Sequence, residues 1–171
     1  MNSAPCNAVT SNARFPDARK HTILVIGIGN EYARDDAAGL LVVRRLKQLG
    51  RTDFAIREES GEGASLMEVW KQASRVIVID AIRSGGQPGG LHRLDASVRP
   101  LPAESFRGST HAFGLYEAVE LARSLGQLPR RLLIFGIEGE NFTAGTGISG
   151  AVELAIGGAV RAVLDEIERL Q

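Results

Sequence analysis

Residues 23–46, ILVIGIGNEYARDDAAGLLVVRRL, decide the expected fold of this 171-residue chain. The stretch opens with an apolar run at 23–26, rich in β-branched residues, which is typical of a strand buried on both faces. Two glycines at 27 and 29 then allow a tight turn. After the acidic pair Asp35-Asp36, apolar residues recur at helical spacing. The pattern predicts a strand, a turn and a helix, with two carboxylates at the edge where open α/β sheets bind their ligands.

The same alternation continues along the chain. Further strands are expected at 53–58, 75–81, 91–94 and 132–138, with helices between most of them and a closing helix after Gly150. The link before 91–94 is too short for a crossover helix, so this strand is expected to be antiparallel and at an edge. The order predicts an α/β fold, a three-layer α/β/α sandwich with a mostly parallel, twisted sheet of about five strands.

One domain accounts for the length of the chain. Residues 1–20 are polar and lack the apolar core of a secretory signal, so we interpret them as a flexible N-terminal extension. Residues 21–171 are then expected to form a single α/β domain with a full core. Nothing in the sequence calls for a second subunit, and we expect a monomer.

Charge and composition narrow the class of partner. Lysine plus arginine equals aspartate plus glutamate at 20 each, and the absence of a basic run argues against nucleic acid as a partner. No apolar run reaches the roughly 20 residues that span a bilayer, so no membrane partner is expected. The single cysteine, Cys6, cannot form an intramolecular disulfide. These features favour a cytoplasmic location.

Three side chains occupy matching places at the expected sheet edge. Asp36 follows the first strand, Asp80 closes the strand at 75–81, and His111 precedes a helix that Ser109 or Thr110 could cap. Two carboxylates and an imidazole suit a divalent metal with nitrogen and oxygen ligands, and they suit acid–base chemistry equally well. Each residue also has a structural interpretation, as a helix cap, a loop anchor or an ordinary early-helix residue.

A nucleotide site is a second interpretation of the first turn. Residues 27–32, GIGNEY, start like a dinucleotide fingerprint, but Tyr32 stands where the third glycine belongs. A nucleotide-binding α/β domain therefore remains an alternative. Serine hydrolysis is disfavoured, because none of Ser60, Ser109 and Ser149 lies in a nucleophile-elbow context.

Four segments resemble the maturation endopeptidases of nickel–iron hydrogenases, which are classed with aspartic-type peptidases. They read ILVIGIGNEYARDDAAG, RVIVIDAIRSG, STHAFGLYEAVELARSLGQLP and RLLIFGIEGENFTAGTGIS, in family order over about residues 22–150. The resemblance implies a hydrolase that removes a C-terminal extension from the precursor of a hydrogenase large subunit already loaded with nickel.

The resemblance also implies roles for particular residues. The family's metal-contacting positions fall on Asp36, Asp80 and His111, the trio that topology suggested. The metal is then the nickel of the substrate and not a cofactor of the enzyme's own, and other divalent ions such as cadmium are expected to fit the same ligands. Asp36 and Asp80 are also the candidates for activating a water, and the attacking group stays open. A non-catalytic scaffold that inspects the nickel site is an alternative.

Overall fold

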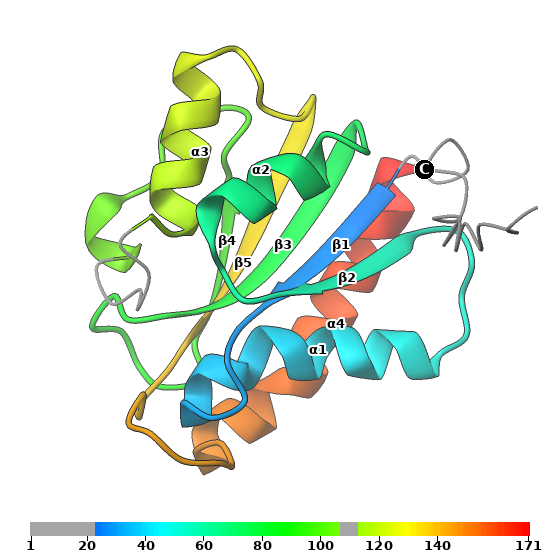
Figure 1. Ribbon diagram of the computed structural model, residues 1–171. Helices are drawn as coiled ribbons and strands as arrows, with labels where there is room; N and C mark the ends of the chain where they lie inside the picture. The colour runs from blue at the N-terminus through cyan, green and yellow to red at the C-terminus, as the bar shows by residue number, and fades with distance from the viewer. Residues whose placement is uncertain (1–22, 107–112) are drawn as a thin grey trace, which may run out of the picture.

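The computed structural model describes residues 23–106 and 113–171 (Figure 1). The strands are β1 (Ile23–Ile28), β2 (Ala55–Glu59), β3 (Arg75–Ile82), β4 (Leu91–Asp95) and β5 (Arg131–Glu138). The α-helices are α1 (Ala38–Gln48), α2 (Gly63–Trp70), α3 (Leu115–Ser124) and α4 (Gly150–Leu170), with short 3-10 helices η1 (Arg34–Ala37) and η2 (Ala103–Phe106). The N-terminal extension predicted for residues 1–20 lies outside the described residues.

The five strands form one sheet in the order β2-β1-β3-β5-β4. The first four strands of this order run parallel, and β4 runs antiparallel to β5 at the edge, as the short link before it predicts. Because β1 and β3 are neighbours, their carboxyl ends lie side by side at one edge of the sheet. Segments that follow these two strands therefore meet there.

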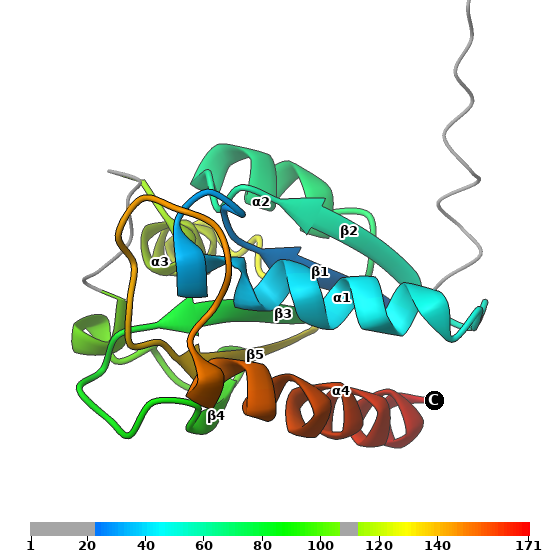
Figure 2. The same ribbon diagram turned by 90° about the horizontal axis from the view of Figure 1, so that it is seen from below.

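Helices cover both faces of the sheet (Figure 2). On one face, α1 and α4 pack on a core that includes Val25, Ile79 and Phe135. On the other, α2 and α3 pack on a core that includes Ile26, Val78 and Trp70. Burial of both faces explains why the strands read as continuous apolar runs. The predicted α/β/α sandwich is confirmed.

Two details differ from the sequence prediction. The first helix is preceded by η1, so the acidic pair lies in a 3-10 turn before α1. The cap expected from Ser109 or Thr110 is wrong, because α3 begins at Leu115 with Gly114 as its N-cap. The Gly114 N–H donates to the Glu117 carboxylate at 2.9 Å, so the oxygen that caps this helix comes from inside its first turn.

None of the helices in the described ranges combines the length and the apolarity needed to cross a membrane.

Candidate functional site

Asp36 and Asp80 come together at the carboxyl edge of the sheet. Asp36 lies in η1, which follows β1, and Asp80 lies near the end of the neighbouring strand β3. Both residues are partly buried. The structure therefore brings together two of the three residues that the sequence analysis selected.

Two glycines let η1 and α1 approach the sheet closely enough for this. A Cβ atom at Gly39 would lie 2.3 Å from the Ile28 carbonyl oxygen and 2.4 Å from that of Ile79. A Cβ atom at Gly29 would lie 2.0 Å from the carbonyl oxygen of Asp36. Contacts this short are forbidden to other residues, so both glycines serve chain packing. On the side of Gly29 where a side chain would project, η1 fills the space, so chain packing alone accounts for this glycine.

The two carboxylates are electrostatically coupled. Burial raises the pKa of Asp80, the negative charge of Asp36 raises it further, and a hydrogen bond from the Ala81 N–H offsets part of the effect, which leaves the pKa at about 7. A carboxyl group with a pKa near neutrality can hold or release a proton under working conditions. Perturbed pairs of this kind are characteristic of functional sites.

The adjacent acid, Asp35, has a structural role. Its buried carboxylate accepts hydrogen bonds from the backbone N–H groups of Glu140 and Asn141, both at 2.8 Å, and of Ser149 at 2.6 Å. Burial raises the pKa of Asp35, but these hydrogen bonds outweigh it and hold the pKa below its usual value. Asp35 thus anchors the loop between β5 and α4 to η1.

The turn that precedes Asp35 and Asp36 has an unusual backbone. Among the described residues other than glycine, Arg34 alone has a positive φ, at 50°. Its N–H donates to the Gly145 carbonyl at 3.1 Å and its Nε to Thr143 Oγ1 at 3.2 Å, so contacts with the anchored loop support this conformation. Left-handed backbone at a non-glycine residue is costly and tends to occur at functional sites.

The third predicted ligand, His111, lies outside the described residues. Within the described ranges, no group of three His, Cys, Asp or Glu side chains has the arrangement of a metal site. The chain is described again from Phe113, whose carbonyl oxygen accepts from the Gly63 N–H at 2.9 Å. Because α2 follows β2, this contact holds Phe113 near the carboxyl edge of the sheet, where Asp36 and Asp80 also lie.

Two features of the carboxyl edge of the sheet were not identified from the sequence. Glu138, at the end of β5, is buried and accepts from the N–H groups of Ser84, Gly85 and Gly86, which fixes the turn after β3. An acid that closes an apolar strand was a signal for it. Beside η1 lies a groove of about 300 Å³. Its lining consists of Gly29, Asn30, Glu31, Tyr32, Leu40, Arg44 and Ser60.

Tyr32, which breaks the dinucleotide fingerprint in the sequence, is 67% exposed and lines this groove. Large exposed aromatic side chains are frequent where proteins bind partners. This edge thus carries an electrostatically coupled carboxylate pair, and residues before and after η1 line a groove of about 300 Å³ whose walls include neither Asp36 nor Asp80.

Comparison with known proteins finds similarity to proteins of hydrogenase maturation. The family model of the hydrogenase maturation proteases matches residues 42–166, a stretch that includes Asp80 and His111 and begins after Asp36. The hydrogenase expression/formation protein HoxM of Azotobacter vinelandii is 32% identical over 120 residues, which cover 69% of this chain and 58% of HoxM. The hydrogenase 2 maturation protease of Escherichia coli is 30% identical over 146 residues, covering 83% of this chain and 88% of that protein.

Among solved structures, the hydrogenase maturating endopeptidase HybD of E. coli superimposes with a TM-score of 0.73 at 27% identity. The match covers 86% of this chain and 92% of HybD. Several curated relatives are longer than this chain. The match spans 53% of the Thiocapsa roseopersicina HupD protein and 73% of the Rhodobacter capsulatus HupD protein.

Proposed function

The chain belongs to the hydrogenase maturation protease family, and we therefore propose that it is an endopeptidase that removes the C-terminal extension of a hydrogenase large-subunit precursor. The carboxylate pair Asp36–Asp80 at the carboxyl edge carries the proposal, because it offers oxygen ligands and a titratable group at one place. The reaction is proposed to occur in the cytoplasm, with the enzyme acting as a monomer.

The proposed recognition step is contact with the nickel of the substrate. Asp36 and Asp80 supply two oxygen ligands and His111 a nitrogen ligand, a set that divalent nickel accepts and that cadmium accepts as a probe. His111 lies outside the described residues, and its role is proposed from the resemblance to the family alone. Nickel acts as part of the substrate, so only a loaded precursor completes the site.

The proposed hydrolytic step uses water as the nucleophile. Without the metal, the pKa of Asp80 is about 7. We propose that the Asp80 oxygen that does not contact nickel accepts the proton from water, as a general base requires. Asp36, partly buried beside it, contributes negative charge that keeps the pair basic. This division of roles agrees with the aspartic class of the peptidases that the sequence resembles.

The groove beside η1 is proposed to hold the peptide extension. Its walls carry the exposed ring of Tyr32, the apolar side chain of Leu40 and the guanidinium of Arg44, which pairs with Glu31 at 3.2 Å. Aromatic and aliphatic surface would bind apolar side chains of the extension, and the ion pair would bind its polar backbone. A bound nickel centre and a peptide in the groove would then place the scissile bond near Asp80.

A processing assay tests the proposal. Purified protein is mixed with a large-subunit precursor in nickel-loaded and nickel-free forms, and the mass of the large subunit is recorded. We expect loss of a C-terminal peptide from the loaded precursor alone. Asp36→Asn, Asp80→Asn and His111→Ala should each lower the rate at least about 100-fold, as loss of a group in general acid–base catalysis does.

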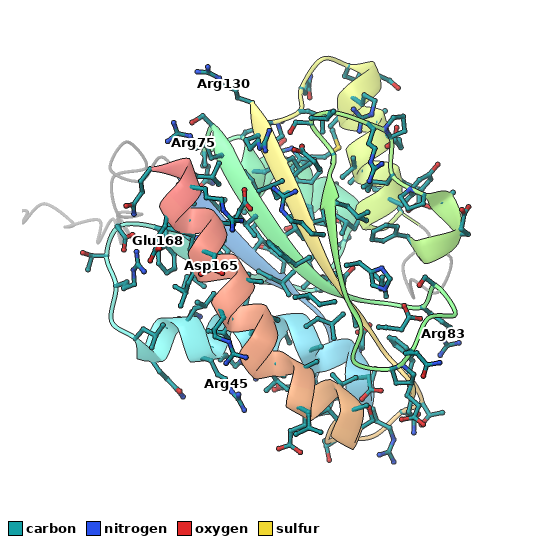
Figure 3. All side chains as sticks on the ribbon, turned by 180° about the vertical axis from the view of Figure 1, so that it is seen from behind. Arg45, Arg75, Arg83, Arg130, Asp165 and Glu168 are labelled. Carbon is teal, nitrogen blue, oxygen red and sulfur yellow. The ribbon has the colours of Figure 1, made fainter. Side chains whose placement is uncertain are left out.

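The matched control is Asp165→Asn, which removes an exposed carboxylate from α4 far from the site (Figure 3). Its rate should equal that of the unmodified protein. Processing at an unchanged rate in the Asp36 or His111 variant would refute the assigned ligands. Tight association with the loaded precursor without any cleavage would instead favour the scaffold and refute the peptidase.

A further inference from the structure

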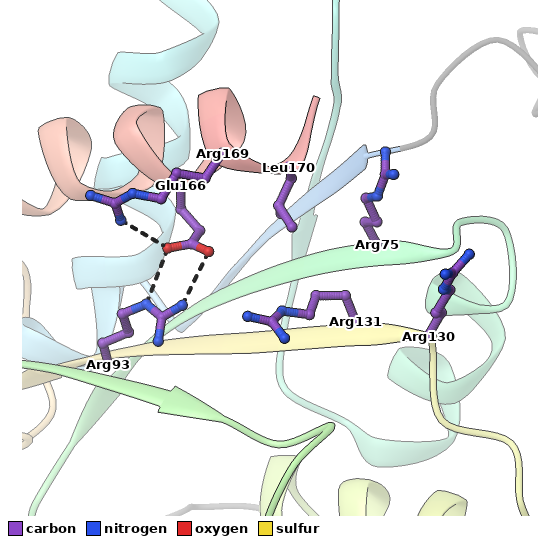
Figure 4. Close-up of a pocket in the computed structure, with 7 residues that line it drawn as sticks. All are labelled: Arg75, Arg93, Arg130, Arg131, Glu166, Arg169 and Leu170. Atoms are coloured by element: carbon purple, nitrogen blue, oxygen red, sulfur yellow. Dashed lines mark hydrogen bonds and ion pairs between the residues drawn. The ribbon is translucent and has the colours of Figure 1, made fainter.

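Five arginines line a pocket at the opposite end of the molecule from Asp36 and Asp80. The pocket, of about 490 Å³, lies between the amino ends of β3 and β5, the strand β4 and the last turn of α4 (Figure 4). Its lining is almost entirely charged: Arg75, Arg93, Arg130, Arg131, Glu166, Arg169 and Leu170.

Strand register explains how the arginines come together. Arg75 and Arg131 are register partners at the starts of β3 and β5, and both continue the rows of residues that face α4. On β4, Arg93 pairs with Phe135 of β5 and therefore faces the same helix. Like charges at paired positions repel each other, so this arrangement raises the energy of the fold unless an anion lies between them.

The nearby carboxylates neutralise only part of the positive charge of the five arginines. Glu166 is buried and accepts from Arg93 Nε and Nη2, both at 3.1 Å, and from Arg169 Nη1 at 3.2 Å. Burial raises the pKa of Glu166, but Arg93 and Arg169 lower it more, so its carboxylate stays ionised. Arg131 pairs with Asp95 at 3.1 Å.

Two guanidinium groups and one buried N–H donor of the pocket are left without a partner among the described residues. Within residues 23–106 and 113–171, the guanidinium groups of Arg75 and Arg130 make no hydrogen bond and no ion pair. In the same ranges, the buried Nε–H of Arg131 has no acceptor. A buried donor without an acceptor is uncommon and costly, and it marks a place where a ligand oxygen would be favourable. Figure 4 shows Arg75, Arg130 and Arg131 along one side of the pocket.

We propose that this pocket binds the phosphate groups of a small phosphorylated molecule. Planar guanidinium groups donate paired hydrogen bonds to phosphate oxygens. A diphosphate, which carries several negative charges, matches the charge of several arginines better than a ligand with a single carboxylate does. The lining contains no aromatic ring, and Leu170 is its one apolar residue. The phosphates are therefore the recognised part, and the remainder of the molecule lies outside the pocket.

Calorimetric titration of the full chain tests the proposal with inorganic pyrophosphate, ADP and a glutamate-rich peptide, at constant ionic strength. We expect one saturable site for pyrophosphate and for ADP, with similar affinities because the base makes no contact. Arg75→Gln and Arg130→Gln should each weaken binding by about tenfold, since each removes a charge-assisted interaction. Binding should also weaken as salt is raised.

The matched control is Arg45→Gln on α1, which removes one exposed guanidinium away from the pocket (Figure 3). This variant should bind pyrophosphate like the unmodified protein. Both pocket variants should melt, without ligand, no lower than the control, because they relieve repulsion. The proposal is overturned if pyrophosphate shows no saturable site, if Arg45→Gln weakens binding as much as the pocket variants, or if the acidic peptide binds and pyrophosphate does not.

Discussion

The negative charge of Asp36 acts on Asp80 across the carboxyl edge of the sheet and raises its pKa. Burial is the larger cause of the shift. Replacing Asp36 by asparagine should therefore lower the pKa of Asp80 while leaving it above the usual value. Carboxyl ¹³C titration by NMR measures this directly, with Asp165→Asn as the control that leaves it unchanged. An unaltered pKa of Asp80 in the Asp36 variant would show that the two groups do not interact.

Neutralising Asp80 should stabilise the protein. Because the folded-state pKa, about 7, lies above the unfolded value of 3.8, Asp80 makes folding less favourable as pH rises between these values. Asp80→Asn should raise the free energy of unfolding at pH 8 by about 1 to 3 kcal/mol, with a smaller gain at pH 5. Urea denaturation at both pH values measures it. A variant less stable than the unmodified protein at pH 8 would contradict the prediction.

Replacing Asp35 by asparagine should destabilise the protein, in contrast to the same change at Asp80. Its folded-state pKa is lowered, so its contribution to stability is present above the unfolded pKa and is lost as pH falls through the folded value. Asp35→Asn should cost about 2 to 4 kcal/mol at pH 7, because an amide cannot accept all three backbone N–H donors. The difference from the unmodified protein should shrink below about pH 4. Asp165→Asn is the control, and an equal loss there would exclude a specific anchor.

Two glycine-to-alanine substitutions should shift stability in opposite directions. Gly39→Ala places a methyl group against two backbone carbonyls, so we expect a loss of about 2 to 4 kcal/mol. A Cβ atom at Gly158, within α4, meets nothing within 4 Å, so alanine there should add about 0.5 to 1 kcal/mol. Thermal unfolding of both variants tests the pair. Equal effects would mean that α1 does not need its close approach to the sheet.

Divalent ions should bind more tightly at high pH. A metal competes with the proton on Asp80, so nickel or cadmium should raise the unfolding temperature more at pH 8 than at pH 5.5. At a metal concentration about 100 times the dissociation constant, binding should raise the free energy of unfolding by about 2.7 kcal/mol. The effect should vanish in Asp36→Asn and persist in Asp165→Asn. A shift of equal size in both variants would locate the metal elsewhere.

Much of the site was predictable because its residues follow strands. Asp36 comes after β1 and Asp80 lies near the end of β3, and parallel neighbours deliver their carboxyl ends to one edge. The start of α3 was not predictable from Ser109 or Thr110, since Glu117 caps that helix from within its own first turn. For His111, which lies outside the described residues, the role as a ligand stays a prediction.

The α/β/α architecture and the antiparallel edge position of β4 could be predicted from local sequence features, because apolar periodicity and link length are local properties. The tertiary structure alone distinguished Asp35 from Asp36. Their neighbourhoods differ only once the loop from residue 139 to 149 folds back and donates three backbone N–H groups to Asp35. The arginine pocket likewise depends on strand register and on the end of α4, which bring together residues that are distant in sequence.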